Sequence, residues 1–140
     1  MSTLKTNTIQ HLTSGFNNVV QFTDGAGTQN GTLCRAWVNF DGTGTVAIRA
    51  QFNVSSITDN NTGDYTVNFS NAMSDANYSI VAGMSGNASS SNGNEFYVST
   101  QLAGPSFNAS YRTSSSNRVS VLDGAGSNRD CADLNIAIFR

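Results

Sequence analysis

Apolar and polar side chains alternate with a period of two over most of the chain beyond residue 30. In the segment 34–40, the apolar positions are separated by Arg35, Trp37 and Asn39. Successive side chains of a β-strand point to opposite faces, so this alternation indicates a strand that buries one face. The alternating segments predict half-buried strands with apolar positions at Cys34, Ala36, Val38, Phe40; Val46, Ile48, Ala50, Phe52; Tyr65, Val67, Phe69; Tyr78, Ile80, Ala82, Met84; Phe96, Val98, Leu102; Val119, Val121; and Ala132, Leu134, Ile136, Ile138.

Turn-forming sequences separate these segments. "DGTG" at 41–44 predicts a hairpin between the first two strands, and "DNNTGD" at 59–64 predicts a second hairpin. Loops rich in small polar residues follow at 86–94, 103–106 and 123–130. Strands that recur at short intervals without a helical period between them are typical of all-β folds. We therefore predict an antiparallel β-sandwich or a jelly-roll-like barrel.

The first 30 residues carry a different pattern. Ile9, Leu12 and Phe16 are spaced three and four apart, as on the apolar stripe of a helix, but 13–18 is rich in residues that break helices and form turns. We expect an extended arm with a short strand near 19–22, and a helix stays open as the alternative. A polar arm with spaced apolar residues is suited to packing on another chain, so Ile9, Leu12 and Phe16 are candidate interface residues.

The length and composition fit one small domain with an appendage. The 140 residues would divide into an N-terminal arm over 1–30 and a β-sandwich head over 31–140. Charged residues make up 11% of the chain, against about 25% in an average soluble domain. Neutral Ser, Thr, Asn and Gly must therefore supply the polar surface. Such a surface suits a protein that works outside the cell or packs against copies of itself.

Charge and hydropathy exclude several classes of partner. The net charge is −2 and the seven basic residues are scattered, so we expect no nucleic-acid partner. No apolar stretch reaches the roughly 20 residues that span a bilayer, so we expect no membrane insertion. The opening "MSTLKTNTIQHLTSG" lacks the apolar core of a signal peptide. We expect that the protein is made in the cytoplasm and does not use the usual export route. Release by cell lysis is compatible with this expectation.

The reactive side chains do not form a recognisable catalytic set. His11 is the only histidine and lies in the arm, and no Gly-x-Ser-x-Gly motif accompanies it. Most aspartates lie in Gly- and Asn-rich turns, where a carboxylate accepts hydrogen bonds from nearby backbone N–H groups. Two carboxylates about 5–9 Å apart could serve a glycosidase, so glycan hydrolysis stays as a disfavoured alternative. We expect a protein that is not an enzyme.

Metal and cofactor sites are not indicated either. Cys34 and Cys131 are too few for a metal site or a disulfide framework, and we interpret them as small buried side chains. They could pair only if their Cα atoms lay within about 7 Å. The turn at 59–64 resembles a calcium loop, but Ser70 stands where such a loop needs its twelfth-position glutamate. We expect no cofactor and no metal.

Two aromatic residues fall out of phase with the apolar face of their own strands. Trp37 and Tyr97 both occupy positions that the alternation assigns to the outer face. Such rings either pack in an interface between subunits or lie open to solvent, where they could stack on sugars. We take Trp37 and Tyr97 as candidate interface residues and keep sugar contact as an alternative.

One long segment resembles a known family. The sequence "CRAWVNFDGTGTVAIRAQFNVSSITDNNTGDYTVNFSNAMSDANYSIV" at 34–81 closely resembles a module of bacteriophage tail-fibre and virion structural proteins, many of them from cyanophages and other marine phages. The opening "STLKTNTIQ" and the final "NIAIFR" are similar to the segments that flank this module in the family. The close resemblance covers about half of the chain. The chain differs from longer fibres in having almost no stalk.

The resemblance implies a virion component, usually trimeric, with a β-rich head on a stalk or arm. We therefore expect a homotrimeric tail fibre or receptor-binding fibre, attached through its arm to tail, baseplate or capsid proteins. Its ligand would be a glycan or protein on the host surface. The alternative is a capsid decoration, head fibre or connector protein with no ligand of its own.

Loops are the natural place for host contact, because a rigid scaffold can present them to a ligand. The segments 86–96, 112–118 and 123–130 are the most polar, have no high net charge and are least constrained by strand packing. Their amide and guanidinium groups could bond to a neutral glycan. The candidate receptor-contact residues are Asn92, Asn94, Arg112 and Arg118.

Overall fold

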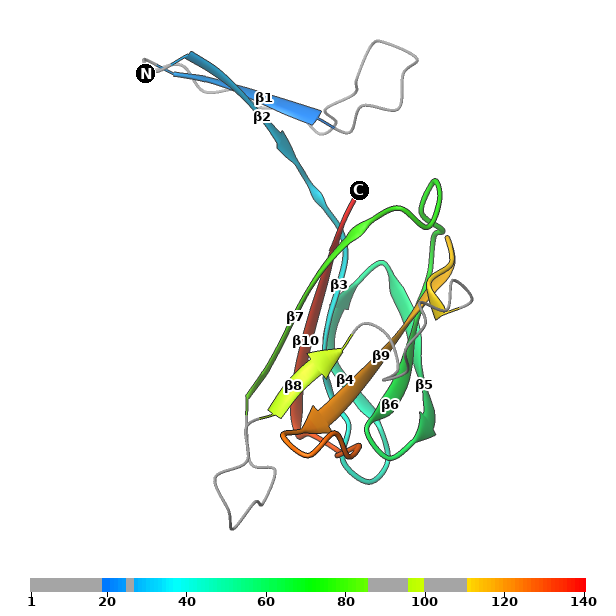
Figure 1. The fold of residues 1–140 in the computed structure, drawn as a ribbon. Coiled ribbons are helices and arrows are strands. Elements are labelled where there is room, and N and C mark those ends of the chain that lie inside the picture. The colour runs from blue at the N-terminus through cyan, green and yellow to red at the C-terminus, as the bar shows by residue number, and fades with distance from the viewer. Residues whose placement is uncertain (1–18, 25–26, 86–95, 100–110) are drawn as a thin grey trace.

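The computed structural model describes residues 19–24, 27–85, 96–99 and 111–140, nearly all of them in strands and the turns between strands. Eight strands form two antiparallel four-stranded sheets, of order β4-β3-β10-β7 and β5-β6-β9-β8 (Figure 1). The predicted all-β antiparallel sandwich is therefore confirmed. The strands are β1 (Val19–Asp24), β2 (Gly27–Thr32), β3 (Cys34–Asp41), β4 (Ala47–Phe52), β5 (Val54–Asn61), β6 (Asp64–Phe69), β7 (Ser79–Ser85), β8 (Phe96–Ser99), β9 (Ser116–Asp123) and β10 (Asp133–Phe139).

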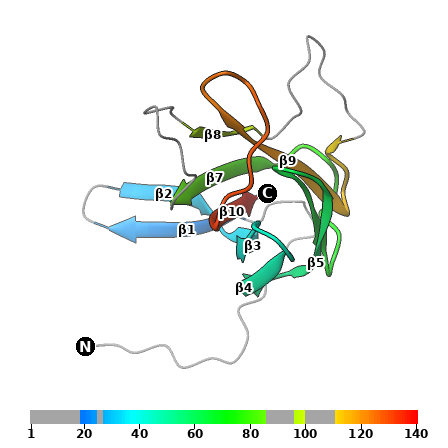
Figure 2. The ribbon, with the colours of Figure 1, turned by 90° about the horizontal axis from the view of Figure 1, so that it is seen from below.

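The two sheets, which Figure 2 shows from below, enclose one apolar core. The alternation predicted from the sequence is confirmed in β3, β6, β7, β9 and β10, whose predicted inner residues, except the half-buried Cys34, are buried or packed on the core. The rings of Phe40 and Tyr65 meet edge to face between the sheets, with centroids 5.4 Å apart. The hydroxyl of Tyr65 donates to Gly42 O at 2.8 Å, so its polar atom is satisfied inside the core.

The prediction that β4 buries one face is wrong. Phe52 is 53% exposed, and Ile48 and Ala50 are exposed as well. Two features explain this. The strand lies at the edge of its sheet, and the pairing with β3 is interrupted by a bulge at Arg49. A bulge inserts one extra residue and thereby changes which side chains point inward. Beyond it, Phe52 pairs with the outward-facing Trp37.

Both predicted hairpins are present, between β3 and β4 and between β5 and β6. Between these hairpins the chain crosses from one sheet to the other at Asn53, whose φ is +55°. The Asn53 amide holds this corner: its Nδ2 donates to Arg35 O at 3.0 Å and to Asn71 O at 3.1 Å. Its Oδ1 accepts from the backbone N of Asn71 at 2.8 Å. An asparagine tolerates this left-handed conformation better than most residues.

A separate hairpin precedes the sandwich. The strand expected near 19–22 is present as β1, and it pairs with β2, a strand that the sequence pattern did not predict. Figure 1 shows this hairpin beyond the start of β3, outside both four-stranded sheets. The alternative of a helix through Ile9, Leu12 and Phe16 concerns positions outside the described residues.

The two cysteines are not joined by a disulfide. Cys34 begins β3, whereas Cys131 O accepts from Gly42 N at 2.9 Å, next to the other end of that strand. An eight-residue strand separates such positions by roughly 20–25 Å, well beyond disulfide reach. Cys131 is fully buried and Cys34 half-buried, close to the predicted role of small core residues. Among the described residues, the structure contains no helix with the length and apolarity needed to cross a membrane.

Candidate functional site

The outer face of the β4-β3-β10-β7 sheet carries a row of apolar side chains that crosses all four strands. The pairing register places Phe52, Trp37, Ala137 and Val81 opposite one another in that order. Directly opposed residues share a face of the sheet, so these four form one band, here called the outer band. Trp37 is 40% exposed, Phe52 53% and Val81 61%. Contiguous exposed apolar surface of this kind marks a binding surface more often than scattered residues do.

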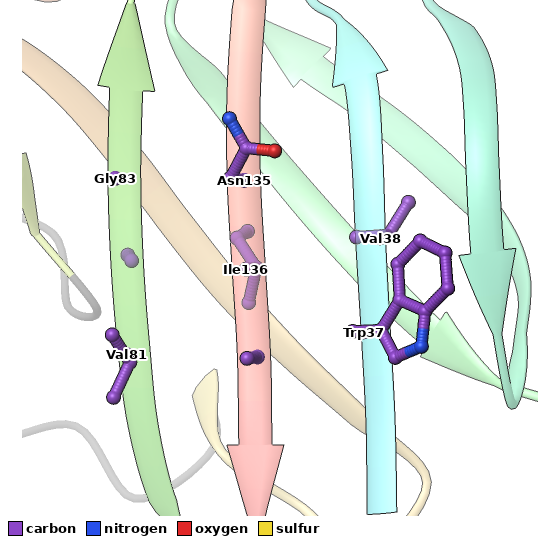
Figure 3. A pocket seen from close by; sticks show the side chains of 8 residues that line it. Trp37, Val38, Val81, Gly83, Asn135 and Ile136 are labelled. Carbon is purple, nitrogen blue, oxygen red and sulfur yellow. The ribbon is translucent and has the colours of Figure 1, made fainter. Parts of the chain in front are cut away.

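A shallow hollow of about 350 Å³ lies within the outer band. Small residues form its floor: Ala137 on β10 and Gly83 on β7. A Cβ added to Gly83 would meet nothing within 4 Å, so the space above this glycine is open. Figure 3 looks onto the hollow, with the Trp37 indole leaning from β3 toward β4, its rings turned broadly toward the viewer, and Val81 projecting from β7. The volume is near the lower end of the range of small-molecule sites, about 300–1,000 Å³.

A row of amides lies next to the outer band. Asn39 on β3 is paired with Asn135 on β10, two residues along each strand from Trp37 and Ala137 and therefore on the same face. Asn39 Nδ2 donates to Asn135 Oδ1 at 2.8 Å and to Asp133 Oδ1 at 2.5 Å. Asn135 Nδ2 also approaches Asp133 Oδ1, at 3.4 Å. These bonds hold both amides in defined orientations at the edge of the hollow.

Ionic groups complete the polar edge. Arg49, the bulged residue of β4, reaches Asp41 Oδ2 at 2.9 Å and Asp133 Oδ1 at 3.5 Å. Asp41 Oδ1 also accepts from the backbone N and the hydroxyl of Thr43, at 2.9 and 2.6 Å. The hydrogen bonds from Thr43, and then the charge of Arg49, hold the pKa of Asp41 below its usual value. The outer face therefore changes from apolar to amide to ionic along the strands.

Arg112 and Arg118, two of the predicted receptor contacts, make structural interactions instead of lying free on a loop. Arg118 Nε donates to Asp64 Oδ1 at 2.7 Å, and its Nη2 bonds to the other carboxylate oxygen. This carboxylate raises the pKa of Arg118. Arg112 Nη1 donates to Tyr78 O at 3.2 Å, with its guanidinium 5.3 Å from the centre of the Tyr78 ring. A role in receptor contact stays a prediction for both arginines.

The other candidate residues fall into two groups. Trp37 lies on the solvent side of its strand, where the alternation had placed it. Tyr97 belongs to β8, but its side chain is outside the described residues. The same holds for every atom of the remaining candidates, which are Asn92, Asn94, Ile9, Leu12 and Phe16.

Asp123 and Asp130 serve turns, as predicted, whereas Asp64 pairs with Arg118. Asp123 Oδ1 accepts from the backbone N of Ala125 at 3.0 Å and of Ser127 at 2.9 Å. The bond from Ser127, followed by the contact with Arg129, lowers the pKa of Asp123. Asp130 Oδ1 accepts from Gly63 N at 2.7 Å and lies 2.8 Å from the hydroxyl oxygen of Tyr65, so it shares the single hydrogen of that hydroxyl with Gly42 O. In the described part of the chain, no group of three or more His, Cys, Asp or Glu side chains is placed to hold a metal ion.

The outer band was not predictable as a unit, although one of its members gave a signal. Trp37 stood out because it breaks the apolar phase of its strand, whereas Val81 and Ala137 look like ordinary alternating residues until β7, β10 and β3 are paired. The face combines a flat aromatic ring, an open hollow and amides whose orientations are fixed by hydrogen bonds. Such groups can bind a small ligand or the surface of a partner, and binding of this kind needs no chemical reaction. Comparisons with protein-family models, curated proteins and solved structures find no match for this chain.

Proposed function

We propose that this chain is a non-enzymatic attachment module of a bacteriophage virion, of the tail-fibre or receptor-binding type. The single observation that carries the proposal is the outer band, a contiguous apolar surface on a rigid sheet. A soluble domain gains nothing from exposing Trp37, Phe52 and Val81 side by side unless something binds there. The band therefore serves as the attachment surface.

The sequence resemblance supports the phage assignment and covers much of the band. The segment 34–81 that resembles virion modules includes Trp37, Phe52 and Val81, and it spans β3 to the start of β7. The low content of charged residues, 11%, suits a particle in which many copies of a chain lie close together. The module would act in the virion after synthesis in the host cytoplasm.

The carboxylates support binding over hydrolysis. Asp123 and Asp130 are held by backbone donors of the turns they stabilise. Asp41 and Asp133 both form ion pairs with Arg49 on the same sheet. A glycosidase needs one carboxyl group that keeps its proton near neutral pH, whereas the pKa values of Asp41 and Asp123 are lowered.

The proposed assembly is a homotrimer whose arms contact other virion proteins. Three identical outer bands would engage a host surface at once, and linked weak sites gain avidity without any new contact. Light scattering of the purified chain at micromolar concentration measures this directly. A mass of three chains is expected, and a monomer mass would contradict the assembly.

A second candidate is a capsid decoration or connector protein. The outer band favours it too, because an apolar surface is also what virion proteins bury against one another. The two candidates differ in where the protein lies on the particle and in whether free protein competes for the host.

The test combines imaging with competition. Labelled antibody should locate the protein on the tail, and purified full-length chain should lower the adsorption rate of phage to host cells. The variant Trp37→Ala should compete at least 10-fold less well, because it removes the centre of the band. The control Leu33→Ala removes another exposed apolar side chain, 58% exposed and outside the band, and should compete like the unmodified chain. Capsid labelling together with no competition would overturn attachment in favour of decoration.

A further inference from the structure

The exposed indole of Trp37 has the geometry of a stacking platform. It leans from β3 toward β4 with its rings turned broadly outward (Figure 3). On the other side of β3, the small residues Ala137 and Gly83 line the hollow over β10 and β7. A flat aromatic face next to an open hollow can receive a second flat, partly apolar ring. The C–H face of a pyranose is such a surface, whereas an aliphatic chain would need no flat partner.

The neighbouring amides have unused hydrogen-bonding capacity. Asn39 uses its Nδ2 for Asn135 and Asp133, while its Oδ1 accepts no hydrogen bond from the described part of the chain. Asn135 Nδ2 carries two hydrogens and, within the described residues, donates toward Asp133 alone. An acceptor and a donor held side by side match a hydroxyl group, which both donates and accepts. Because both amides are already held in fixed orientations, less side-chain conformational entropy is lost when a ligand binds.

We infer that the hollow of the outer band binds an uncharged pyranose ring of a surface glycan. Trp37 stacks on the apolar face of the sugar, and Asn39 and Asn135 bond its hydroxyls. The inference rests on the proposed attachment function and names the ligand class of that same surface.

The polar edge selects against other occupants. A wholly apolar partner would bury the Asn39 and Asn135 amides without hydrogen bonds, which is unfavourable. An acidic sugar or phosphate would approach Asp41 and Asp133, whose two negative charges face one Arg49. A hollow open to solvent also fits a small ring better than the flat surface of a second chain.

The only tryptophan of the chain lies in the site, so its emission reports on binding without a label. The full-length chain would be titrated with glucose, galactose, mannose, N-acetylglucosamine and their neutral disaccharides. At least one should give a saturable change in Trp37 emission, with a dissociation constant on the order of 1 mM for a single ring. N-acetylneuraminic acid, which is negatively charged, should bind at least 5-fold more weakly.

Gly83→Val is the decisive variant. Its Cβ enters open space and valine favours strands, so the fold should be kept while the hollow is filled. Sugar affinity should fall at least 10-fold, and Asn135→Ala should lower it about 3- to 10-fold, the loss expected for one hydrogen bond. Leu33→Ala serves as the matched control and should leave the affinity unchanged. Circular dichroism verifies that each variant is folded.

Three outcomes would overturn the inference. In the first, none of the neutral sugars changes the emission although Gly83→Val abolishes competition for adsorption. The band then binds a host protein, and the attachment function stands. In the second, the emission shifts with protein concentration alone as the mass rises, so a second copy covers the band. In the third, sugars bind but Gly83→Val binds them as well as the unmodified chain, so the site lies elsewhere.

Discussion

Arg118 and Asp64 join β9 to β6 through a charge pair on the body of the sandwich. The Asp64 side chain is only 6% exposed, so its charge needs a partner. Arg118 supplies two donors to this carboxylate and places its guanidinium 4.7 Å from the centre of the Tyr111 ring. Arg118, which lies in a polar segment that the sequence suggested was a loop, therefore stabilises the fold.

Replacing Arg118 by Ala should lower the free energy of unfolding by about 2–4 kcal/mol, because it leaves a buried carboxylate unpaired. The lower part of that range is expected, since Arg118 itself is 27% exposed. The double variant Asp64→Asn with Arg118→Ala should recover part of the loss. Urea unfolding measures each difference. The control Arg49→Ala removes the ion pairs with Asp41 and Asp133, in which the arginine is 42% exposed, and should cost about 0–1 kcal/mol. Equal losses for Arg118→Ala and Arg49→Ala would refute the structural role.

Two glycine turns with similar backbones have different surroundings. Gly44 and Gly63 have φ values of +59° and +61°, so any other residue is strained at either position. At Gly63 an added Cβ would lie 2.5 Å from both the backbone N and O of Arg129, whereas at Gly44 it would meet nothing within 4 Å. The β5–β6 turn is thus packed at Gly63 against the segment between β9 and β10, whereas the β3–β4 turn has open space around Gly44.

This difference predicts unequal effects of the same substitution. Gly44→Ala should lower the free energy of unfolding by about 1 kcal/mol, the cost of a left-handed alanine. Gly63→Ala should cost about 3 kcal/mol or more, because backbone atoms cannot move aside without disturbing the turn. Thermal and urea unfolding of the two variants provide the comparison. Equal costs would mean that the turn is not packed as described.

The strands that alternate cleanly were predictable, and the exceptions have local causes. In β10, Leu134, Ile136 and Ile138 are buried as predicted, because both neighbours of the strand continue the sheet. In β4, the bulge at Arg49 depends on the pairing with β3, which a single strand's pattern does not contain. β2 was not predicted, because its sequence, GTQNGT, has no alternating apolar residues that would form an apolar face.

The candidate site depends even more on pairing. Trp37 and Ala137 are one hundred residues apart in sequence and become neighbours only through the β3–β10 register. Neither Gly83 nor Asn135 differs locally from the many other small polar residues of the chain. The sequence pattern could therefore single out the ring of Trp37, but not the hollow and the amides beside it.

The core of the sandwich is built from residues of the head. Where side-chain burial is described, the buried apolar residues lie between Ala36 and Ile138, while the β1–β2 hairpin forms a separate two-stranded sheet. An isolated hairpin is marginally stable in water at best, so β1 and β2 need a partner surface for stability. In the whole molecule, the stability of the head therefore does not depend on the arm.

Deleting residues 2–30 should therefore leave a folded head. Its far-UV circular dichroism should keep the strand signal, and its thermal midpoint should stay within about 5 °C, a change of roughly 1 kcal/mol for a domain of this size. Incorporation into particles should be lost if the arm is the anchor. A shortened chain that is unfolded would show that the arm contributes to the core.

The central position of β10 has a kinetic consequence. β10 pairs with β3 on one side and β7 on the other, and its Leu134 lies opposite Phe40, 94 residues earlier in the chain. Contacts between such distant segments form slowly, because the entropy of closing the loop is lost before the pairing energy is gained. Until β10 arrives, β3 and β7 each keep an open edge that can pair with another unfinished chain. During synthesis, completion of this sheet must therefore wait for the last of its four strands, and crowding of nascent copies in that interval favours aggregation.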